Sequence, residues 1–149
     1  MDDFGEKLNN LLVETFRDIL KIEEKMLKSR DMNLSISEIH VIEAVGKGEK
    51  IPKTISELAE DLDVTIPSVT NAIKKLEANG YVEKRKSAND GRSVFVSLTR
   101  LGEKVDNVHK YFHKKMIMSL SKELSEQDKL SLAHAVERLD KFFKEELDL

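Results

Sequence analysis

Residues 54–98 read TISELAEDLDVTIPSVTNAIKKLEANGYVEKRKSANDGRSVFVSL, and most of the fold follows from them. The first half predicts two short helices, one running from a capping box at Thr54 to about Leu62 and the other running to about Asn79. A break of only three residues, 63–65, separates them. Because two helices joined by so short a turn must cross steeply to share one small core, the sequence predicts a helix-turn-helix.

The second of these helices has a polar and basic outer face. Thr65 is a good N-cap, and a proline follows in the first turn, where a missing N–H costs nothing. Small hydroxyls, an amide and two ammonium groups can hydrogen-bond to base edges or neutralise phosphates in a major groove. The face consists of Pro67, Ser68, Asn71, Lys74 and Lys75. The alternative for these helices alone is an ordinary helical hairpin with a solvated polar face.

A β-hairpin is predicted directly after the second helix. Residues 81–86 and 93–98 are short segments, the latter rich in β-forming residues, and Asn89-Asp90-Gly91 between them is a strong turn signal. The hairpin carries Lys84-Arg85-Lys86 on one side and Arg92 at its tip. A basic hairpin beside a recognition helix is typical of a wing that lays an arginine into the minor groove, which favours the DNA-binding interpretation.

The rest of the chain is predicted to be helical. A long amphipathic helix covers residues 3–28, and a second helix covers about 35–45. After the hairpin, Thr99 caps a helix that reaches about Leu120, and Ser125 caps a last helix. The expected fold class is therefore mainly α with a small β-hairpin wing.

We expect one domain over residues 1–149, with a winged helix-turn-helix lobe at 35–98 and dimerisation helices at 1–34 and 99–149. The apolar stripes of the terminal helices exceed what the small winged core can cover, so they favour a homodimer. A two-fold dimer places its recognition helices about 34 Å apart, in successive major grooves of a pseudo-palindromic operator.

Charge is unevenly distributed along the chain. The net charge is −3, but residues 74–92 contain six basic and three acidic side chains, whereas residues 1–24 and 123–149 are acidic. A basic centre between acidic ends indicates one DNA-facing surface and a separate body.

Several classes of protein are excluded or disfavoured. The chain has no cysteine, which excludes disulfides, thiolate metal sites and cysteine catalysis. No apolar run approaches the roughly 18 residues of a membrane span. The N-terminus lacks a signal-peptide pattern, so we expect a cytoplasmic protein. A Gly-rich phosphate loop and a Gly-x-Ser-x-Gly sequence are both missing, so we expect neither an enzyme nor a cofactor.

Three motifs together resemble the MarR family of dimeric winged-helix repressors and activators. They are residues 55–59 (ISELA), 69–82 (VTNAIKKLEANGYV) and 89–102 (NDGRSVFVSLTRLG), and the resemblance covers nearly the whole chain. It implies a transcriptional regulator, most simply a repressor, that contacts double-stranded DNA. The implied DNA-binding residues are Thr65, Pro67, Ser68, Thr70, Asn71, Lys74, Lys75, Arg85, Asp90 and Arg92.

The wing departs from the family pattern at one position. The usual motif is Asp-Arg-Arg, whereas this chain has Asp90-Gly91-Arg92, so one wing arginine is missing. The family pattern implies that Asp90 holds Arg85 or Arg92 by an ion pair while Arg92 reaches the DNA.

Within the family, residues 22–24, 37–40 and 108–116 are similar to the fatty-acid-biosynthesis repressors of Gram-positive bacteria, whose co-repressor is acyl chains on acyl carrier protein. This finer resemblance implies an apolar effector site between the lobe and the dimerisation helices. Its expected lining is Leu11, Thr15, Ile19, Ile22, His40 and His109, with the stripe of the first helix facing the second and fifth helices. The alternative is that these apolar residues all belong to the core.

The histidines support a different effector. His109 and His113 are four residues apart on one helix face, and His40 lies in a helix that could adjoin theirs. Zinc-responsive MarR members use similar histidines, and a carboxylate such as Glu23 or Glu24 would complete a tetrahedral site, although those members also use a cysteine. A zinc-responsive regulator is therefore the alternative function. A winged helix used only for protein contacts is a further one.

Overall fold

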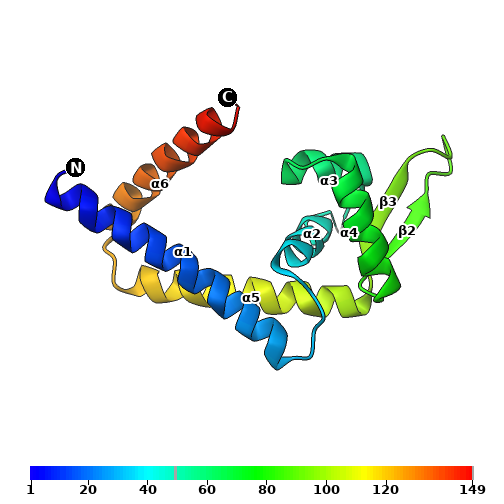
Figure 1. The fold of residues 1–149 in the computed structure, drawn as a ribbon, viewed down its shortest axis with the longest axis horizontal. Coiled ribbons are helices and arrows are strands. Elements are labelled where there is room, and N and C mark those ends of the chain that lie inside the picture. Colours follow the sequence, from blue (N-terminus) through cyan, green and yellow to red (C-terminus); the bar gives the residue numbers. More distant parts are fainter. Residues whose placement is uncertain (49, 149) are drawn as a thin grey trace. The chain divides into compact units, whose positions relative to one another are not determined.

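The computed structural model describes residues 1–48 and 50–148. The chain forms two compact units, the first ending at His109 and the second starting at Lys110. The first unit contains α1 (Asp3–Ser29), α2 (Ile36–Gly46), β1 (Lys53–Thr54), α3 (Ile55–Leu62), α4 (Ile66–Ala78), β2 (Val82–Lys86), β3 (Val94–Leu98) and the start of α5 (Arg100–Lys122) (Figure 1). The second holds the rest of α5 and α6 (Glu126–Leu147). This architecture confirms the predicted fold class.

Side-chain caps set where the helices begin. Ser35, Thr54 and Ser125 each open a capping box, in which the hydroxyl accepts a backbone N–H and the carboxylate three residues on accepts the N–H of the cap. Thr65 caps α4, with Pro67 in the first turn. These are the caps that the sequence predicts, because a capping box needs only residues three positions apart.

The sheet holds one strand more than predicted. β2 and β3 pair antiparallel, with Val82 opposite Leu98, and form the expected hairpin. β1 pairs with the other edge of β3, with Lys53 opposite Val96, so the strand order is β1-β3-β2. A strand of two residues cannot show an alternating pattern, and the segment was expected only to lead into α3. Pairing with β3, rather than local propensity, makes it a strand.

The core of the first unit lies among α2, α3, α4 and the sheet. Ile42 of α2, Leu58 of α3, and Ile73 and Leu76 of α4 are completely buried, and Val96 of β3 joins them. α4 is therefore anchored along one side, and its opposite side is left to solvent.

The buried positions of α1 differ from the predicted ones. Glu23 is buried, whereas Ile22, which we expected to face α2 and α5, is 44% exposed. Hydropathy periodicity cannot place Glu23 on the inner side, because its carboxylate is buried together with a partner on α5. The other predicted lining residues of this helix are exposed or half-buried, namely Leu11, Thr15 and Ile19.

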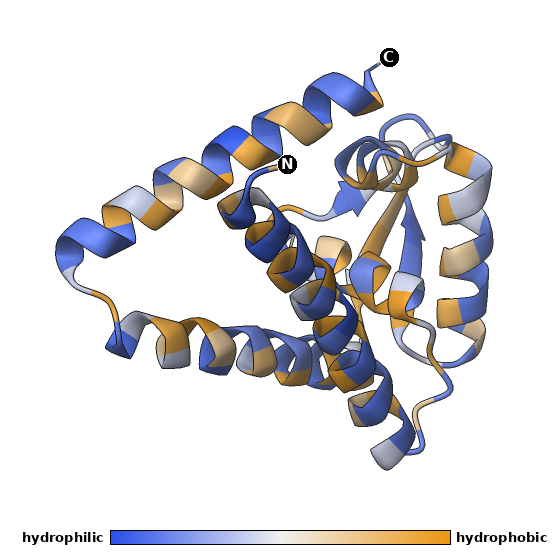
Figure 2. Cartoon of the chain, turned by 60° about the vertical axis from the view of Figure 1, so that its left-hand side comes forward, coloured by the Kyte–Doolittle hydropathy of each residue, from blue (hydrophilic) through white to orange (hydrophobic). Residues whose placement is uncertain are grey.

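Both long terminal helices carry exposed apolar side chains (Figure 2). On α1 they include Phe4, Leu8, Leu11, Leu12 and Phe16, and on α6 Leu130, Val136, Phe142 and Phe143. Across the described residues, none of the helices combines the length and apolar character that a membrane crossing requires.

Candidate nucleic-acid interface

α4 presents a polar face because its apolar residues, Val69, Ile73 and Leu76, are buried in the core. A helix with this spacing must turn the residues between them outward. The structure leaves almost all of the predicted contact residues of this helix exposed: Thr65, Pro67, Ser68, Asn71, Lys74 and Lys75, with Thr70 half-buried.

The hydroxyls on this face already have local partners. Thr65 Oγ1 accepts the Ser68 N–H at 3.3 Å and lies 2.8 Å from Ser68 Oγ. Thr70 Oγ1 donates to the carbonyl oxygen of Ile66 at 2.9 Å. Within the described part of the chain, the Asn71 side chain makes no hydrogen bond, so its amide is the group best able to pair with a base edge.

The two lysines of α4 lie in different surroundings. Lys75 Nζ lies 2.7 Å from Glu38 Oε1 on α2. Lys74 is exposed and enters no ion pair with any residue that the structure describes. Sequence reasoning treated both as phosphate contacts, because the partner of Lys75 lies on another helix and has no local signature.

The tip of the wing is held by Asp90. One carboxylate oxygen accepts the N–H groups of Arg92 and Ser93, both at 2.9 Å, and the other accepts the Ser93 hydroxyl at 2.9 Å. These bonds favour the ionised carboxylate, so the Ser93 N–H first, then the Arg92 N–H and the Ser93 hydroxyl, lower the pKa of Asp90 below its ordinary value.

The expected ion pair of Asp90 with an arginine is a prediction that the structure corrects. Among the described residues, neither Arg85 nor Arg92 pairs with this carboxylate, and both are exposed. Gly91 has a φ of 64°, and its N–H donates to the carbonyl oxygen of Ser87 at 3.1 Å. This tight turn brings the carboxylate onto the wing's own N–H groups, which occupy its oxygens.

The base of the wing is tied to the end of α4 and the start of α5. Thr99 Oγ1 donates to the carbonyl oxygen of Gly80 at 2.6 Å and accepts the Gly102 N–H at 3.1 Å. A Cβ added at Gly102 would lie 2.1 Å from the carbonyl oxygen of Tyr81. Sequence reasoning missed this contact, although a glycine inside a predicted helix is the signal that could have found it.

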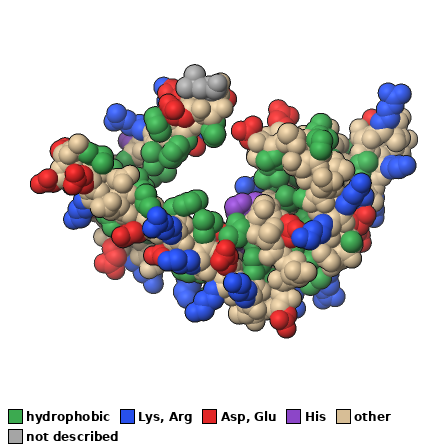
Figure 3. Space-filling view, viewed as in Figure 1, with side chains coloured by type: hydrophobic (Ala, Val, Ile, Leu, Met, Phe, Trp, Pro, Cys, Tyr) green, Lys and Arg blue, Asp and Glu red, His purple; other side chains and the backbone are tan. Residues whose placement is uncertain are grey.

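A further contact joins the wing to α4, since Lys84 Nζ of β2 lies 3.2 Å from Glu77 Oε1 of α4. Basic side chains gather along the wing and beside α4 (Figure 3). Those of the predicted interface that remain exposed are Lys74, Lys75, Arg85 and Arg92. The recognition helix and the wing are thus held as neighbours with their basic groups in solvent.

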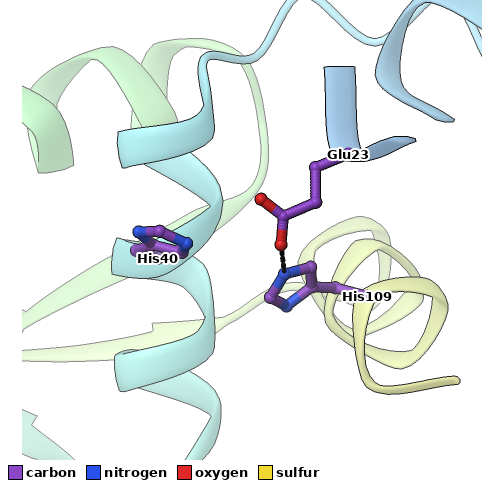
Figure 4. A group of neighbouring side chains, drawn as sticks. All are labelled: Glu23, His40 and His109. Atoms are coloured by element: carbon purple, nitrogen blue, oxygen red, sulfur yellow. Dashed lines mark hydrogen bonds and ion pairs between the residues drawn. The ribbon is translucent and has the colours of Figure 1, made fainter. Parts of the chain in front are cut away.

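A second polar group joins α1, α2 and α5 within the first unit (Figure 4). Glu23 and His109 are buried, with 2.8 Å between Glu23 Oε1 and His109 Nε2. His109 Nδ1 lies 3.7 Å from Glu43 Oε2. His40 is exposed, and its ring centroid is 6.1 Å from that of His109. One ligand atom each of Glu23, His40 and His109 lies within 4.8 Å of the others, so these residues could hold a zinc ion.

Of the residues named for the metal alternative, the structure brings together His40 and His109, with Glu23 as the carboxylate. His113 lies on the part of α5 that belongs to the second unit, and its role as a ligand stays a prediction.

The space beside this group is small. Residues of α1, α2 and α5, among them Glu23, Leu27, Ile39 and Val105, line a cavity of about 10 Å³. Such a volume holds at most about one water molecule. An acyl chain therefore does not fit there in this conformation. The predicted lining residues Leu11, Thr15, Ile19 and Ile22 are not part of its wall.

Comparison with known proteins places the winged lobe in a family. The sequence model of the MarR family matches residues 34–94. The crystal structure of Streptococcus pneumoniae FabT in complex with DNA is similar over 95% of this chain and 98% of that one, with 32% identity and a TM-score of 0.84.

Two curated relatives match in part. The HTH-type transcriptional regulator YhjH of Bacillus subtilis is 32% identical over 82 residues, and Hpr of Bacillus licheniformis is 30% identical over 102 residues. These matches cover 55% and 68% of this chain but only 46% and 48% of the relatives, so the chain spans about half of their length. The family match over the lobe and the FabT match over nearly the whole chain agree, and this protein therefore belongs to the MarR family.

Proposed function

We propose that the protein is a transcriptional regulator that binds a pseudo-palindromic operator as a homodimer. The observation that carries this proposal is the exposed polar and basic face of α4 beside a basic wing. Asn71 and Ser68 would contact base edges in the major groove, Lys74 would neutralise a phosphate, and Arg92 would enter the minor groove. FabT, which is similar over nearly the whole chain, has been solved in complex with DNA.

The terminal helices would form the dimer interface, with the lobe at residues 35–98 between dimerisation helices at 1–34 and 99–149. The exposed apolar side chains of α1 and α6 support this division, because a partner subunit would remove them from water. Proteins of the MarR family are DNA-binding regulators rather than enzymes, which agrees with the expected lack of catalytic function. Such a regulator would act in the cytoplasm.

Selection from a random-sequence duplex library tests the proposal. We expect an inverted repeat whose half-sites are centred about one helical turn, 34 Å, apart, and an affinity that falls steeply with salt. Asn71→Ala should relax the base preference at one position of each half-site. An absence of both enrichment and salt dependence would favour the alternative of a winged helix used for protein contacts.

We further propose that long-chain acyl groups on acyl carrier protein regulate the DNA affinity, and that the protein represses genes of lipid synthesis. The similarity to FabT and to the fatty-acid-biosynthesis repressors at residues 22–24, 37–40 and 108–116 supports this effector class. Because the cavity beside Glu23 is about 10 Å³, an acyl chain could enter only if α1 separated from α2 and α5. Binding would then shift the lobe between two states that differ in DNA affinity.

A zinc-responsive regulator is the second candidate, and the group of Glu23, His40 and His109 favours it. The decisive measurement is affinity for the selected duplex in the presence of acyl carrier protein with a long acyl chain, of zinc, and of a chelator. An acyl effect of about tenfold, or about 1.4 kcal/mol of coupling, without a chelator effect supports the acyl proposal. A chelator effect that His40→Ala abolishes, and that His134→Ala on α6 leaves intact, supports zinc.

A further inference from the structure

Lys75 of α4 forms an ion pair with α2 rather than standing free beside its neighbour Lys74. Lys75 Nζ lies 2.7 Å from Glu38 Oε1, and the Glu38 side chain is only 10% exposed, compared with 56% for Lys75. The other oxygen of the same carboxylate accepts the Ser35 N–H at 3.0 Å and so completes the capping box of α2. One carboxylate therefore links the beginning of α2 to the recognition helix.

The energetics of the pair are asymmetric. A carboxylate that is nearly buried depends on the ammonium group that faces it, because removal of one partner leaves a desolvated charge behind. The N-terminus of α2 favours the negative charge of Glu38 but does not hold α4 in place. Of these interactions, only the contact with Lys75 fixes how α4 rotates against α2.

We propose that Lys75 is a positioning residue for DNA recognition. It acts through Glu38 and sets the orientation of α4, while Lys74 supplies the phosphate contact on the same helix. The inference rests on the proposed DNA-binding function and corrects the expectation that both lysines neutralise phosphates. The Glu38–Lys75 pair controls affinity without itself releasing counterions from the DNA.

The two roles differ in their dependence on salt. Each lysine that neutralises a phosphate adds about 0.9 to the magnitude of the slope of log affinity against log salt concentration. The experiment measures this slope for the full-length protein on the duplex selected by the wild type. Lys74→Met should lower its magnitude by about 0.9. Lys75→Met should weaken binding by roughly threefold to tenfold and leave the slope unchanged.

Glu38→Gln gives a second readout of opposite sign for the two roles. Gln keeps the acceptor of the capping box but removes the charge that holds Lys75. Loss of positioning should weaken DNA binding, although removal of a negative charge near DNA would otherwise strengthen it. The double variant with Lys75→Met should bind no more weakly than the weaker single variant, and Lys75→Arg should restore most of the affinity.

The proposal is overturned if Lys75→Met lowers the slope as Lys74→Met does, or if Glu38→Gln tightens binding, since Lys75 would then be a phosphate contact that Glu38 competes for. Circular dichroism and thermal unfolding of every variant verify the fold. If Lys75→Met does not fold, Glu38→Gln and Lys75→Arg decide the question. A wild-type protein without salt-dependent DNA affinity would instead remove the proposed function itself.

Discussion

Arg92 is the residue of the wing whose replacement we expect to cost the most affinity. Its backbone N–H is held by Asp90, while its side chain is exposed at the wing tip. Arginine reads narrow minor grooves, where the negative potential is enhanced. Arg92→Ala should therefore weaken operator binding by roughly 1–3 kcal/mol, and more at sites with an A·T-rich flank. Binding isotherms on duplexes with A·T-rich and G·C-rich flanks measure both effects.

Arg138→Ala is the matched control for Arg92→Ala, because it removes the same charge from α6, outside the proposed interface. It should change the affinity little on either flank. Equal losses for the two variants, or wild-type binding by Arg92→Ala, would show that the wing is not a DNA contact.

Asp90 makes the order of the wing tip depend on pH. Its pKa is lowered in the folded protein, so its contribution is present above the unfolded-state pKa and is lost as the pH falls through the lower folded pKa. We expect the amide resonances of Arg92 and Ser93 to stay fixed at neutral pH and to shift only in acid, at a pH below the ordinary carboxylate range. Ser93→Ala, which keeps the N–H but removes the hydroxyl, should move this transition to higher pH. A transition at the ordinary aspartate value in both proteins would contradict the role of these bonds.

The first turn of α5 is the element that fixes the base of the wing. Gly102 allows it to lie against Tyr81, where a Cβ would come 2.1 Å from a backbone oxygen that cannot move aside easily. Gly102→Ala should therefore lower the free energy of unfolding by about 1–3 kcal/mol, the usual cost of overpacking. Urea unfolding monitored by circular dichroism measures the loss.

Gly5→Ala serves as the control for Gly102→Ala, because its added Cβ would meet the flexible side chain of Met1 rather than backbone. Alanine is also the better helix former, so this variant should be neutral or slightly stabilising. If Gly102→Ala behaved in the same way, α5 would not be constrained by the wing.

The assembled protein should be a dimer. The chain mass is 17.0 kDa, and sedimentation at micromolar concentration should give about twice that value. The physical reason is the set of apolar side chains left exposed on α1 and α6, which a partner subunit would bury. Val136→Glu on α6 should shift the equilibrium toward monomer, whereas Glu137→Gln beside it should not. A monomer that still bound the operator tightly would refute the two-fold arrangement.

Features that depend on residues close together in the chain could be predicted from the sequence. The capping boxes at Ser35 and Thr54 involve residues three positions apart, and they placed the starts of α2 and α3. The turn at residues 89–91 identified the hairpin, and the spacing of apolar residues in α4 identified its outer face. The MarR family assignment rests on such local motifs, because each of them carries its own physical signal.

Contacts between distant residues could not be predicted in this way. Glu23 is buried because His109, 86 positions away, faces it, and Lys75 pairs with Glu38 on another helix. β1 exists because β3 offers an edge, and Asp90 binds its own turn instead of an arginine. A charged side chain has the same hydropathy whether it is solvated or paired, so its partner becomes known only when the packing of the helices brings the two groups together.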